Sequence, residues 1–299
     1  MRDRMLQRLA YWLIPPGFQN VIRKFLSAPG LDLDPTTAAV RRIVEKNSRF
    51  RNSHLGERCF ILATGPSIKE QDLTVLKGEL CIAVSHFFLH KDLDVVSPKY
   101  HVLAPYHPPF GFDDIRTVFA GMKKYYKNKP MVFCGHRPYE YSIYNFLQKH
   151  PEYKDENNFF LDYSLSSILD EENYNKEECW DICEKPFEIR SVIYSAIQVA
   201  FYMGCKEIYL LGCDHDYLND TQRVSNHHFY REEDGTSDVA NLSAFTTERW
   251  FGEYHTRWRD YRLINTYLTQ KGCRIFNATK GGMLDVFPRV DFTEMFKVK

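Results

Sequence analysis

The chain has 299 residues, with 39 basic and 39 acidic side chains, so its formal net charge at neutral pH is zero. A protein that binds nucleic-acid backbones needs a surplus of Lys and Arg to neutralise phosphates, so this balance argues against a nucleic-acid partner. Aromatic residues make up 15% of the chain, which excludes intrinsic disorder. No apolar run approaches the roughly 20 residues that a membrane-spanning helix requires. The length fits one large domain.

The first 26 residues are basic and amphipathic, with Arg and Lys interleaved among Leu, Ile, Trp and Phe. Such a segment can lie on an anionic membrane surface, with its apolar side chains in the interface and its basic side chains at the phosphates. The alternative is a helical hairpin packed on the domain and broken at Pro15-Pro16. We expect no signal peptide, because the apolar core is too short and no small-residue cleavage site follows. We assign residues 1–50 to this N-terminal helical segment and residues 51–299 to the main domain.

From residue 57 onward, short apolar runs alternate with stretches of helical period. This alternation predicts an α/β fold with a Rossmann-like, doubly wound and mostly parallel sheet. In such sheets the ligand binds outside the carboxyl ends of the strands. The predicted strands are residues 58–63, 80–84, 100–104, 131–134, 207–211 and 274–276, and the predicted helices are residues 191–203 and 256–269.

Two segments interrupt this alternation. Residues 151–188 are rich in Asp and Glu, most densely from 170 to 184, and predict a solvated surface excursion. Residues 219–250 are polar and follow a predicted strand, which is typical of an active-site lid.

The eight cysteines do not form the pattern of a disulfide-rich protein, which is typical of short secreted domains. Most of them lie in apolar, strand-like runs, where we expect buried thiols. Cys179 and Cys183 are spaced for one face of a helix, but no second pair with zinc-ligand spacing accompanies them. We therefore expect free thiols and a reducing, cytoplasmic compartment.

The sharpest local motif follows the first predicted strand, where ATGPS leads from Ala63 to Ser67 into a short helical stretch. Gly65 lets a ligand approach the backbone, and Pro66 and Ser67 can start a helix whose free N–H groups face a phosphate. The alternative is an ordinary connection between strand and helix. The glycine spacing of a Walker loop or of a dinucleotide-binding loop is absent.

The motif GCDHD follows the strand predicted at residues 207–211 and contains Asp214, His215 and Asp216. A carboxylate at a strand end is placed to meet a ribose or an acceptor hydroxyl. Asp214 and Asp216 also have the spacing of the acidic pair with which many nucleotide-sugar transferases hold Mg²⁺ or Mn²⁺. Both interpretations stay open, because such short patterns are frequent by chance.

His255 directly precedes the helix predicted at residues 256–269. The N-terminus of a helix disfavours the imidazolium, so this position would keep the ring neutral and able to accept a proton. Glu253 would favour the charged form instead, and a structural role is the alternative. His227 and His228 are adjacent but lack the identifiable partners that a metal site needs.

Taken together, these features resemble the bacterial lipooligosaccharide sialyltransferases of glycosyltransferase family 42. They also resemble a wider group that contains Maf-type flagellin glycosyltransferases and archaeal hydroxymethylpterin pyrophosphokinase-like proteins. The resemblance covers residues 57–289 and is carried by three blocks. These blocks are residues 61–68 (ILATGPSI), residues 191–214, which end in GCKEIYLLGCD, and residues 255–276, which lead into NATKGG.

The resemblance implies a single Rossmann-like domain with a mobile lid. It implies a CMP-activated nonulosonic acid as the donor, inversion at the anomeric carbon and no required metal. Asp214 would lie at the floor of the nucleotide pocket, and Ser191 would contact the cytidine or its phosphate. The remaining site residues that the resemblance implies are Gly65, Pro66 and Ser67 along the pocket and His255 as the general base.

The chain departs from the family pattern at nucleotide-contacting positions. Two Asn residues of the family correspond to Thr64 and Ser85, which keep a hydroxyl group but lose an amide. A phosphate-holding Tyr of the family corresponds to Asp216. The remaining candidates for holding the phosphate are Tyr217, one position after Asp216, Tyr230 in the lid, and Lys280.

We therefore predict an inverting, sialyltransferase-like glycosyltransferase of lipopolysaccharide or capsule assembly, cytoplasmic and peripheral on the inner membrane face. Its partners would be a nucleotide-sugar donor and a glycan or lipid-linked glycan acceptor, and it would need no cofactor. One alternative is a Mg²⁺-dependent pyrophosphokinase-like enzyme with Asp214 and Asp216 as ligands. The other is a non-catalytic nucleotide-binding protein. Homo-oligomers are compatible with every interpretation, and no sequence pattern identifies the acceptor.

Overall fold

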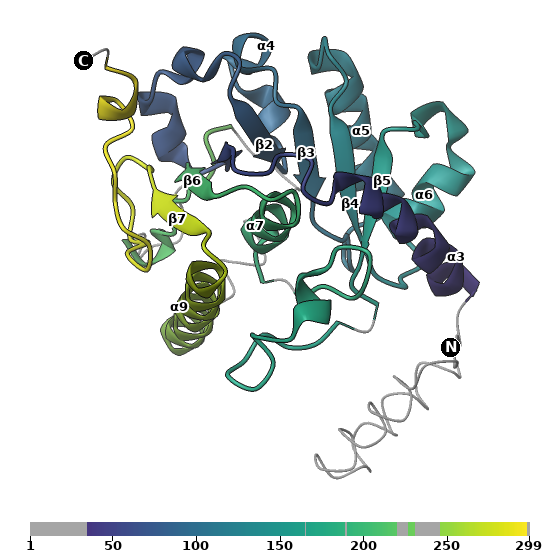
Figure 1. Cartoon of the computed structure of the whole chain (residues 1–299). Coiled ribbons are helices and arrows are strands. Elements are labelled where there is room, and N and C mark those ends of the chain that lie inside the picture. The colour runs from purple at the N-terminus through teal and green to yellow at the C-terminus, as the bar shows by residue number, and fades with distance from the viewer. Residues whose placement is uncertain (1–34, 165, 189, 220–226, 231–245, 298–299) are drawn as a thin grey trace.

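The chain folds around one parallel sheet, shown in Figure 1 as a computed structural model. The structure describes residues 35–164, 166–188, 190–219, 227–230 and 246–297. Within these residues, seven strands form the sheet in the order β5-β4-β3-β2-β1-β6-β7, and every neighbouring pair is parallel. The predicted doubly wound α/β fold is confirmed.

The strands are short apolar runs that are buried almost throughout, as a parallel sheet covered by helices on both faces requires. All six predicted strands exist, and their ends fall within two residues of the prediction. The bounds are β1 (Arg58–Leu62), β2 (Leu80–Val84), β3 (Tyr100–Leu103), β4 (Met131–His136), β5 (Asn158–Asp162), β6 (Glu207–Leu211) and β7 (Arg274–Asn277).

The seventh strand, β5, lies inside residues 151–188, so the prediction of a solvated surface excursion is wrong. β5 pairs with β4 at the edge of the sheet. Further along the same segment, Trp180 and Phe187 are buried in the core, and Trp180 stacks on Tyr267 with ring centroids 4.4 Å apart. The acidic residues lie on the turns between these buried apolar residues. Because there are many of them, the pattern of buried positions is hard to see in the sequence.

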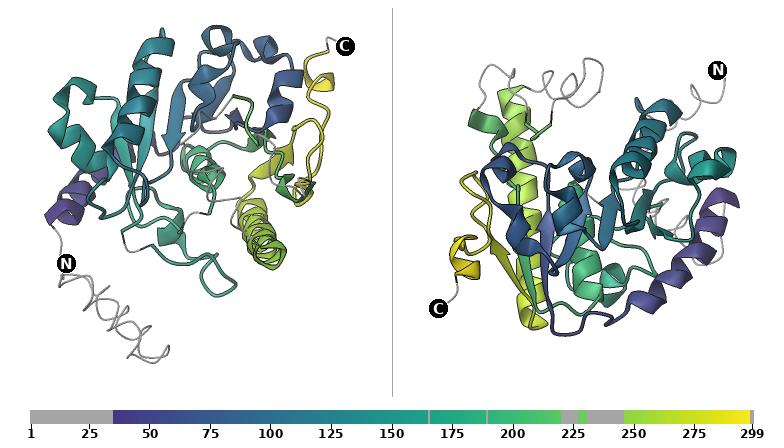
Figure 2. Two further views of the ribbon diagram at one scale, coloured as in Figure 1. Left: turned by 180° about the vertical axis from the view of Figure 1, so that it is seen from behind. Right: turned by 90° about the horizontal axis from the view of Figure 1, so that it is seen from above.

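Helices cover both faces of the sheet (Figure 1 and Figure 2). One apolar cluster packs α7 and α9 against one face, and a second cluster packs α3, α5 and α6 against the other. The helix bounds are α3 (Pro35–Val44), α4 (Leu93–Val96), α5 (Phe112–Tyr125), α6 (Ile143–Lys149), α7 (Val192–Tyr202) and α9 (Thr247–Gln270), with short 3-10 helices at η1 (Glu45–Phe50), η2 (Pro66–Glu70), η3 (Leu73–Leu76), η4 (Phe87–Leu89), η5 (Pro151–Tyr153), η6 (Glu177–Trp180), η7 (Tyr217–Asn219) and η8 (Glu294–Phe296).

Of the two predicted helices, α7 is confirmed and α9 begins earlier than predicted. Ser191 caps α7, because its hydroxyl accepts the N–H of Ile193 at 3.3 Å. α9 begins at Thr247 and not at residue 256, and the Thr246 hydroxyl caps it. The polar composition of this first part and the internal glycine mask its helical period.

The described residues before β1, 35–57, belong to the same packed body. Val40 and Phe50 are buried, and the Asn47 amide donates to the carbonyls of Phe160 and Ile182, both at 2.8 Å. The predicted division at residue 50 stays a prediction. The basic amphipathic segment lies outside the described residues, and so does most of the predicted lid. Among the described helices, none has both the length and the apolar character to cross a membrane.

The cysteines behave as predicted for core thiols. All eight are free, and seven of them are buried. Cys179 lies in η6, which ends at Trp180, so Cys179 and Cys183 do not share a helix. The interpretation that Cys179 and Cys183 lie on one face of a helix is therefore wrong.

The carboxyl end of β4 leaves no room for a side chain at Gly135. A Cβ atom there would lie 2.4 Å from the backbone nitrogen of Pro105, so we expect Gly135→Ala to lower the free energy of unfolding by about 1–3 kcal/mol. Gly252, inside α9, has no atom within 4 Å of such a Cβ. Gly252→Ala should therefore raise the free energy of unfolding by about 0.5–1 kcal/mol. Urea unfolding measures the change in the free energy of unfolding for each variant. Equal changes in the two variants would contradict the close packing at Gly135.

Candidate functional site

A cavity of about 120 Å³ lies where β1 and β6 end and α7 begins. The sheet grows in one direction from β1 to β5 and in the other through β6 and β7, so the cavity lies at the topological switch point. This is the place where doubly wound sheets bind their ligands. The predicted site residues that line the cavity are Thr64, Gly65, Ser85, Ser191, Asp214, Asp216 and Tyr217.

The loop after β1 packs directly on Asp214. A Cβ atom on Gly65 would lie 1.8 Å from the Asp214 carboxylate and 2.5 Å from the Gly212 carbonyl oxygen, so only glycine fits. The Gly65 N–H donates to the Gly212 carbonyl at 2.9 Å, and the Ser67 N–H donates to Asp214 Oδ1 at 3.2 Å. Pro66 has no N–H to offer. The predicted phosphate cradle is therefore wrong at these positions, because the loop uses its donors to hold the two strand ends together.

Asp214 carries a buried and incompletely satisfied carboxylate. Only 6% of the residue is exposed, and its Oδ2 has no hydrogen-bond partner. Burial raises the pKa of Asp214 to about 6, and the neighbouring Asp216 raises it as well, against the hydrogen bond from Ser67. Pro66 and Ser67, which the sequence analysis placed along the pocket, are not among the described residues that line the cavity. A buried carboxylate oxygen normally has a hydrogen-bond partner in proteins, and Asp214 lines the cavity, so a ligand with a hydroxyl or an amino group suits Asp214 Oδ2.

Asp214 and Asp216 line the same cavity, as a shared metal ion would require. Across the described residues, however, no three His, Cys, Asp or Glu side chains are grouped so that they could hold an ion. Mg²⁺ is usually held by one or two carboxylates together with water and substrate phosphates. The pair therefore offers part of a ligand set, and the remaining ligands would have to come from water or from a bound phosphate.

α9 holds the segment after β6 in place. The Tyr254 hydroxyl donates to the His215 carbonyl at 2.7 Å, and the Tyr261 hydroxyl lies 2.8 Å from His215 Nε2. Trp250 stacks on Tyr217 at 5.4 Å. Burial lowers the pKa of His215 to about 3, so its ring is a neutral, structural group. The sequence analysis missed these contacts of α9 with the site. Residues 250, 254 and 261 do have helical spacing, but two of them precede the predicted start of the helix.

Residues 227–230 attach the insertion after β6 to the loop after β1. The Phe229 N–H donates to the Thr64 carbonyl at 2.8 Å, and the Phe229 side chain is buried. The Thr64 hydroxyl lies 3.0 Å from His228 Nδ1. The His228 ring stacks on Tyr230 with centroids 5.0 Å apart and planes within 3°. This stretch places His228 on the cavity wall, although the sequence analysis assigned it no specific role.

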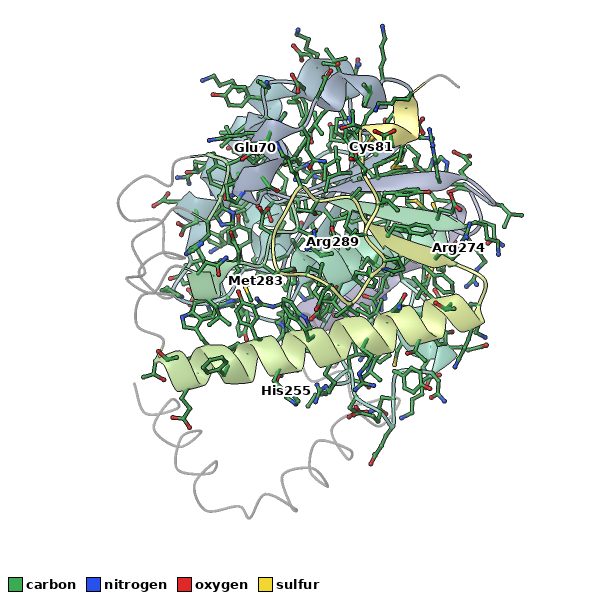
Figure 3. All side chains as sticks on the ribbon, turned by 90° about the vertical axis from the view of Figure 1, so that its left-hand side faces the viewer. Glu70, Cys81, His255, Arg274, Met283 and Arg289 are labelled. Atoms are coloured by element: carbon green, nitrogen blue, oxygen red, sulfur yellow. The ribbon has the colours of Figure 1, made fainter. Side chains whose placement is uncertain are left out.

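His255, Tyr230 and Lys280 are not among the described residues that line the cavity. His255 is exposed in the third turn of α9 (Figure 3), so the predicted effect of a helix N-terminus on its ring is wrong. Tyr230 stacks on the ring of His228. Lys280 is exposed and pairs with Glu70 at 2.9 Å.

No family model and no curated protein matches the chain. Among solved structures, it is similar to the sialyltransferase CstII from Campylobacter jejuni in complex with cytidine-5'-monophosphate, at 15% identity over 79% of this chain and 85% of that chain, with a TM-score of 0.47. CstII in complex with CMP-3FNeuAc gives 16% identity over 78% and 86%, with a TM-score of 0.48. The monofunctional alpha-2,3-sialyltransferase Cst-I from the same organism gives 16% identity over 78% and 80%, with a TM-score of 0.42.

We expect Asp214→Asn to stabilise the ligand-free protein at neutral pH. The pKa of Asp214 in the folded state, about 6, lies above its ordinary value of 3.8, so stability falls as the pH rises through this interval and stays lower above it. The amide keeps the shape and removes the charge. Melting temperatures between pH 4 and pH 8 should show the variant above the native chain at pH 7 and the difference narrowing toward pH 4.

The control for this experiment is Asp94→Asn, which removes an exposed carboxylate that pairs with Lys127. Surface changes of this kind usually alter the free energy of unfolding by less than about 0.5 kcal/mol. If the difference in melting temperature between the native chain and Asp214→Asn did not vary with pH, this would contradict a buried charge on Asp214.

Proposed function

We propose that the protein is a glycosyltransferase that takes a sugar from a nucleotide-linked donor. The observation that carries this proposal is the convergence of distant sequence blocks on one cavity. Thr64, Ser191 and Asp214 follow or precede three different elements, and all of them line the cavity at the switch point. These are positions that the sequence resemblance assigns to nucleotide binding.

The cavity offers complementary groups for a nucleoside. Asp214 lines the cavity and its Oδ2 is buried without a hydrogen-bond partner, so this carboxylate can bind a hydroxyl or amino group of a ribose or a base. The first turn of α7, with Val192 and Ile193, also lines the cavity. The positive end of this helix dipole favours an anionic group such as a phosphate.

In the proposed reaction, His255 acts as the general base. It takes the proton of the acceptor hydroxyl while the oxygen attacks the anomeric carbon in line, and the nucleotide leaves into the cavity. Phe251 lies one helical turn before His255 and is 62% exposed. An exposed aromatic ring beside the base provides an apolar surface on which an acceptor sugar can pack.

The finer proposal names a CMP-linked nonulosonic acid as donor and a bacterial surface glycan as acceptor, with inversion of the anomeric carbon. It also includes a peripheral position on the inner membrane through the basic amphipathic segment. A second candidate function is a Mg²⁺-dependent transfer of diphosphate. The observation that favours this candidate is the shared position of Asp214 and Asp216 in the cavity.

A nucleotide screen tests the proposal directly. We expect one of CMP, UDP, GDP and ATP to raise the melting temperature, because a ligand that binds only the folded state stabilises it. The corresponding nucleotide sugar should then be turned over in the presence of EDTA. Stabilisation without turnover would favour a non-catalytic nucleotide-binding protein, and strict dependence on Mg²⁺ would favour the second candidate.

Replacing the proposed base should separate catalysis from binding. We expect His255→Ala to lower turnover by about 10²–10⁴-fold, the usual contribution of general base catalysis, while the nucleotide affinity stays within about twofold. His150→Ala is the matched control, because His150 follows α6 near the opposite edge of the sheet. Unchanged turnover in His255→Ala would show that His255 is not the general base. The nucleotide screen would then still test the proposed transferase activity.

A further inference from the structure

β3 carries a histidine where a parallel sheet normally places an apolar side chain. His101 is fully buried in β3, between Tyr100 and Val102, and pairs in register with Ala83 of β2. Interior strands of such sheets are near-continuous apolar runs, because both of their faces are covered. Burying a polar ring costs free energy unless its nitrogens find hydrogen-bond partners. The proposed reaction does not use His101, so another role has to account for its place in the strand.

Both ring nitrogens of His101 have partners. Nε2 lies 2.8 Å from the Ser85 carbonyl oxygen, and Nδ1 lies 2.7 Å from the Tyr126 hydroxyl. Because a carbonyl oxygen can only accept, the hydrogen of the ring lies on Nε2, and His101 donates to Ser85. Burial lowers the pKa of His101 to about 3, so the ring is neutral and Nδ1 accepts from Tyr126. Burial also raises the pKa of the Tyr126 hydroxyl, which keeps this donor protonated.

Ser85 directly follows β2 and begins the turn into η4. Its φ of +50° lies in the left-handed region, which is unfavourable for a residue that has a side chain. Such a conformation persists only where the surrounding structure fixes it. The Ser85 N–H donates to the Val102 carbonyl at 3.2 Å, and the Ser85 carbonyl accepts from His101. β3 therefore holds both backbone groups of a residue that lines the cavity.

We propose that His101 is a positioning residue of the nucleotide site and acts through Ser85. The inference rests on the proposed nucleotide-dependent function. The Nε2–H of His101 fixes the Ser85 carbonyl, and the left-handed backbone fixed in this way sets where Ser85 meets the ligand. Less ordering of this corner is then needed when a ligand binds, which lowers the entropy lost on binding. His101 is fully buried and is not among the described residues that line the cavity, so it acts without touching the ligand.

Two substitutions at His101 separate the bond to Ser85 from the bond to Tyr126. The Gln amide reaches the position of Nε2 and can donate to Ser85, whereas the shorter Asn amide stays near the position of Nδ1 and can accept from Tyr126. We expect His101→Asn to weaken nucleotide binding by about tenfold, because Ser85 then adopts the binding conformation only part of the time. His101→Gln should keep the affinity within about threefold. Calorimetry measures both affinities with whichever of CMP, UDP, GDP and ATP raises the melting temperature of the native chain.

Tyr126→Phe is the matched control. It removes the other partner of the same ring and leaves the Ser85 carbonyl bound, so it should lower the melting temperature and keep the nucleotide affinity within about twofold. All affinities are compared at one temperature below every melting transition. A loss of affinity in Tyr126→Phe as large as in His101→Asn would overturn the proposal, because any damage to this part of the core would then weaken binding.

A double-mutant cycle tests whether His101 acts through Ser85. Ser85→Ala removes the hydroxyl at the cavity and should itself weaken nucleotide binding. Adding His101→Asn to Ser85→Ala should then weaken binding little further, since the side chain that His101 positions is already gone. Additive losses would overturn the proposal.

The tautomer of His101 can be measured in the native chain without a ligand. Nitrogen NMR of the imidazole distinguishes a ring nitrogen that carries a hydrogen from one that does not, and we expect the hydrogen on Nε2. A hydrogen on Nδ1, or a charged ring at neutral pH, would overturn the bond to Ser85.

The outcomes separate this inference from the proposed function. If no nucleotide binds the native chain, both fall together. If a nucleotide binds and His101→Asn binds it as tightly as the native chain, only the positioning role of His101 is wrong.

Discussion

The contact between the ends of β1 and β6 determines the rest of the site. Gly65 lies so close to Gly212 and Asp214 that no side chain can be added there, and Gly282 closes the other side, where a Cβ would lie 2.6 Å from the Asp214 carbonyl oxygen. The Asp214 carboxylate thus packs against Gly65 and its main chain against Gly282, and only 6% of the residue stays exposed. Its raised pKa, its unpartnered Oδ2 and the use of the loop donors within the protein all follow from this one approach of two chain segments.

A second layer keeps this arrangement rigid. α9 is anchored along its inner face, where Tyr254 and Tyr261 bond to His215 and Trp250 stacks on Tyr217. The segment after β6 therefore rests on a long helix, although it is itself a loop. Support of this kind holds functional side chains in a fixed geometry before the ligand arrives, which lowers the entropy lost on binding.

Most of the fold could be predicted from the sequence, because a parallel sheet buries both faces of its strands and so leaves continuous apolar runs. β5 was missed since Phe159 and Phe160 stand among many carboxylates. Doubly wound sheets bind their ligands outside the carboxyl ends of the strands, and this rule was sufficient to predict that Thr64, Ser85 and Asp214 lie near one site. It could not place His228, whose position depends on the path of an insertion and on a single backbone hydrogen bond from Phe229 to Thr64. Nor could it show that the backbone donors around Gly65 are already engaged.

The backbone at Ser85 has a consequence for how such a site can evolve. Ser85 has a φ of +50°, in the left-handed region that Asn adopts more readily than most residues. Asn is the residue that the family resemblance places at this corner of the pocket. The chain already has the conformation that suits an amide side chain, so exchange between Ser and Asn changes the hydrogen-bonding group without rerouting the backbone. The hydrogen-bonding character of this cavity-lining position can therefore change through a single substitution, with little effect on folding.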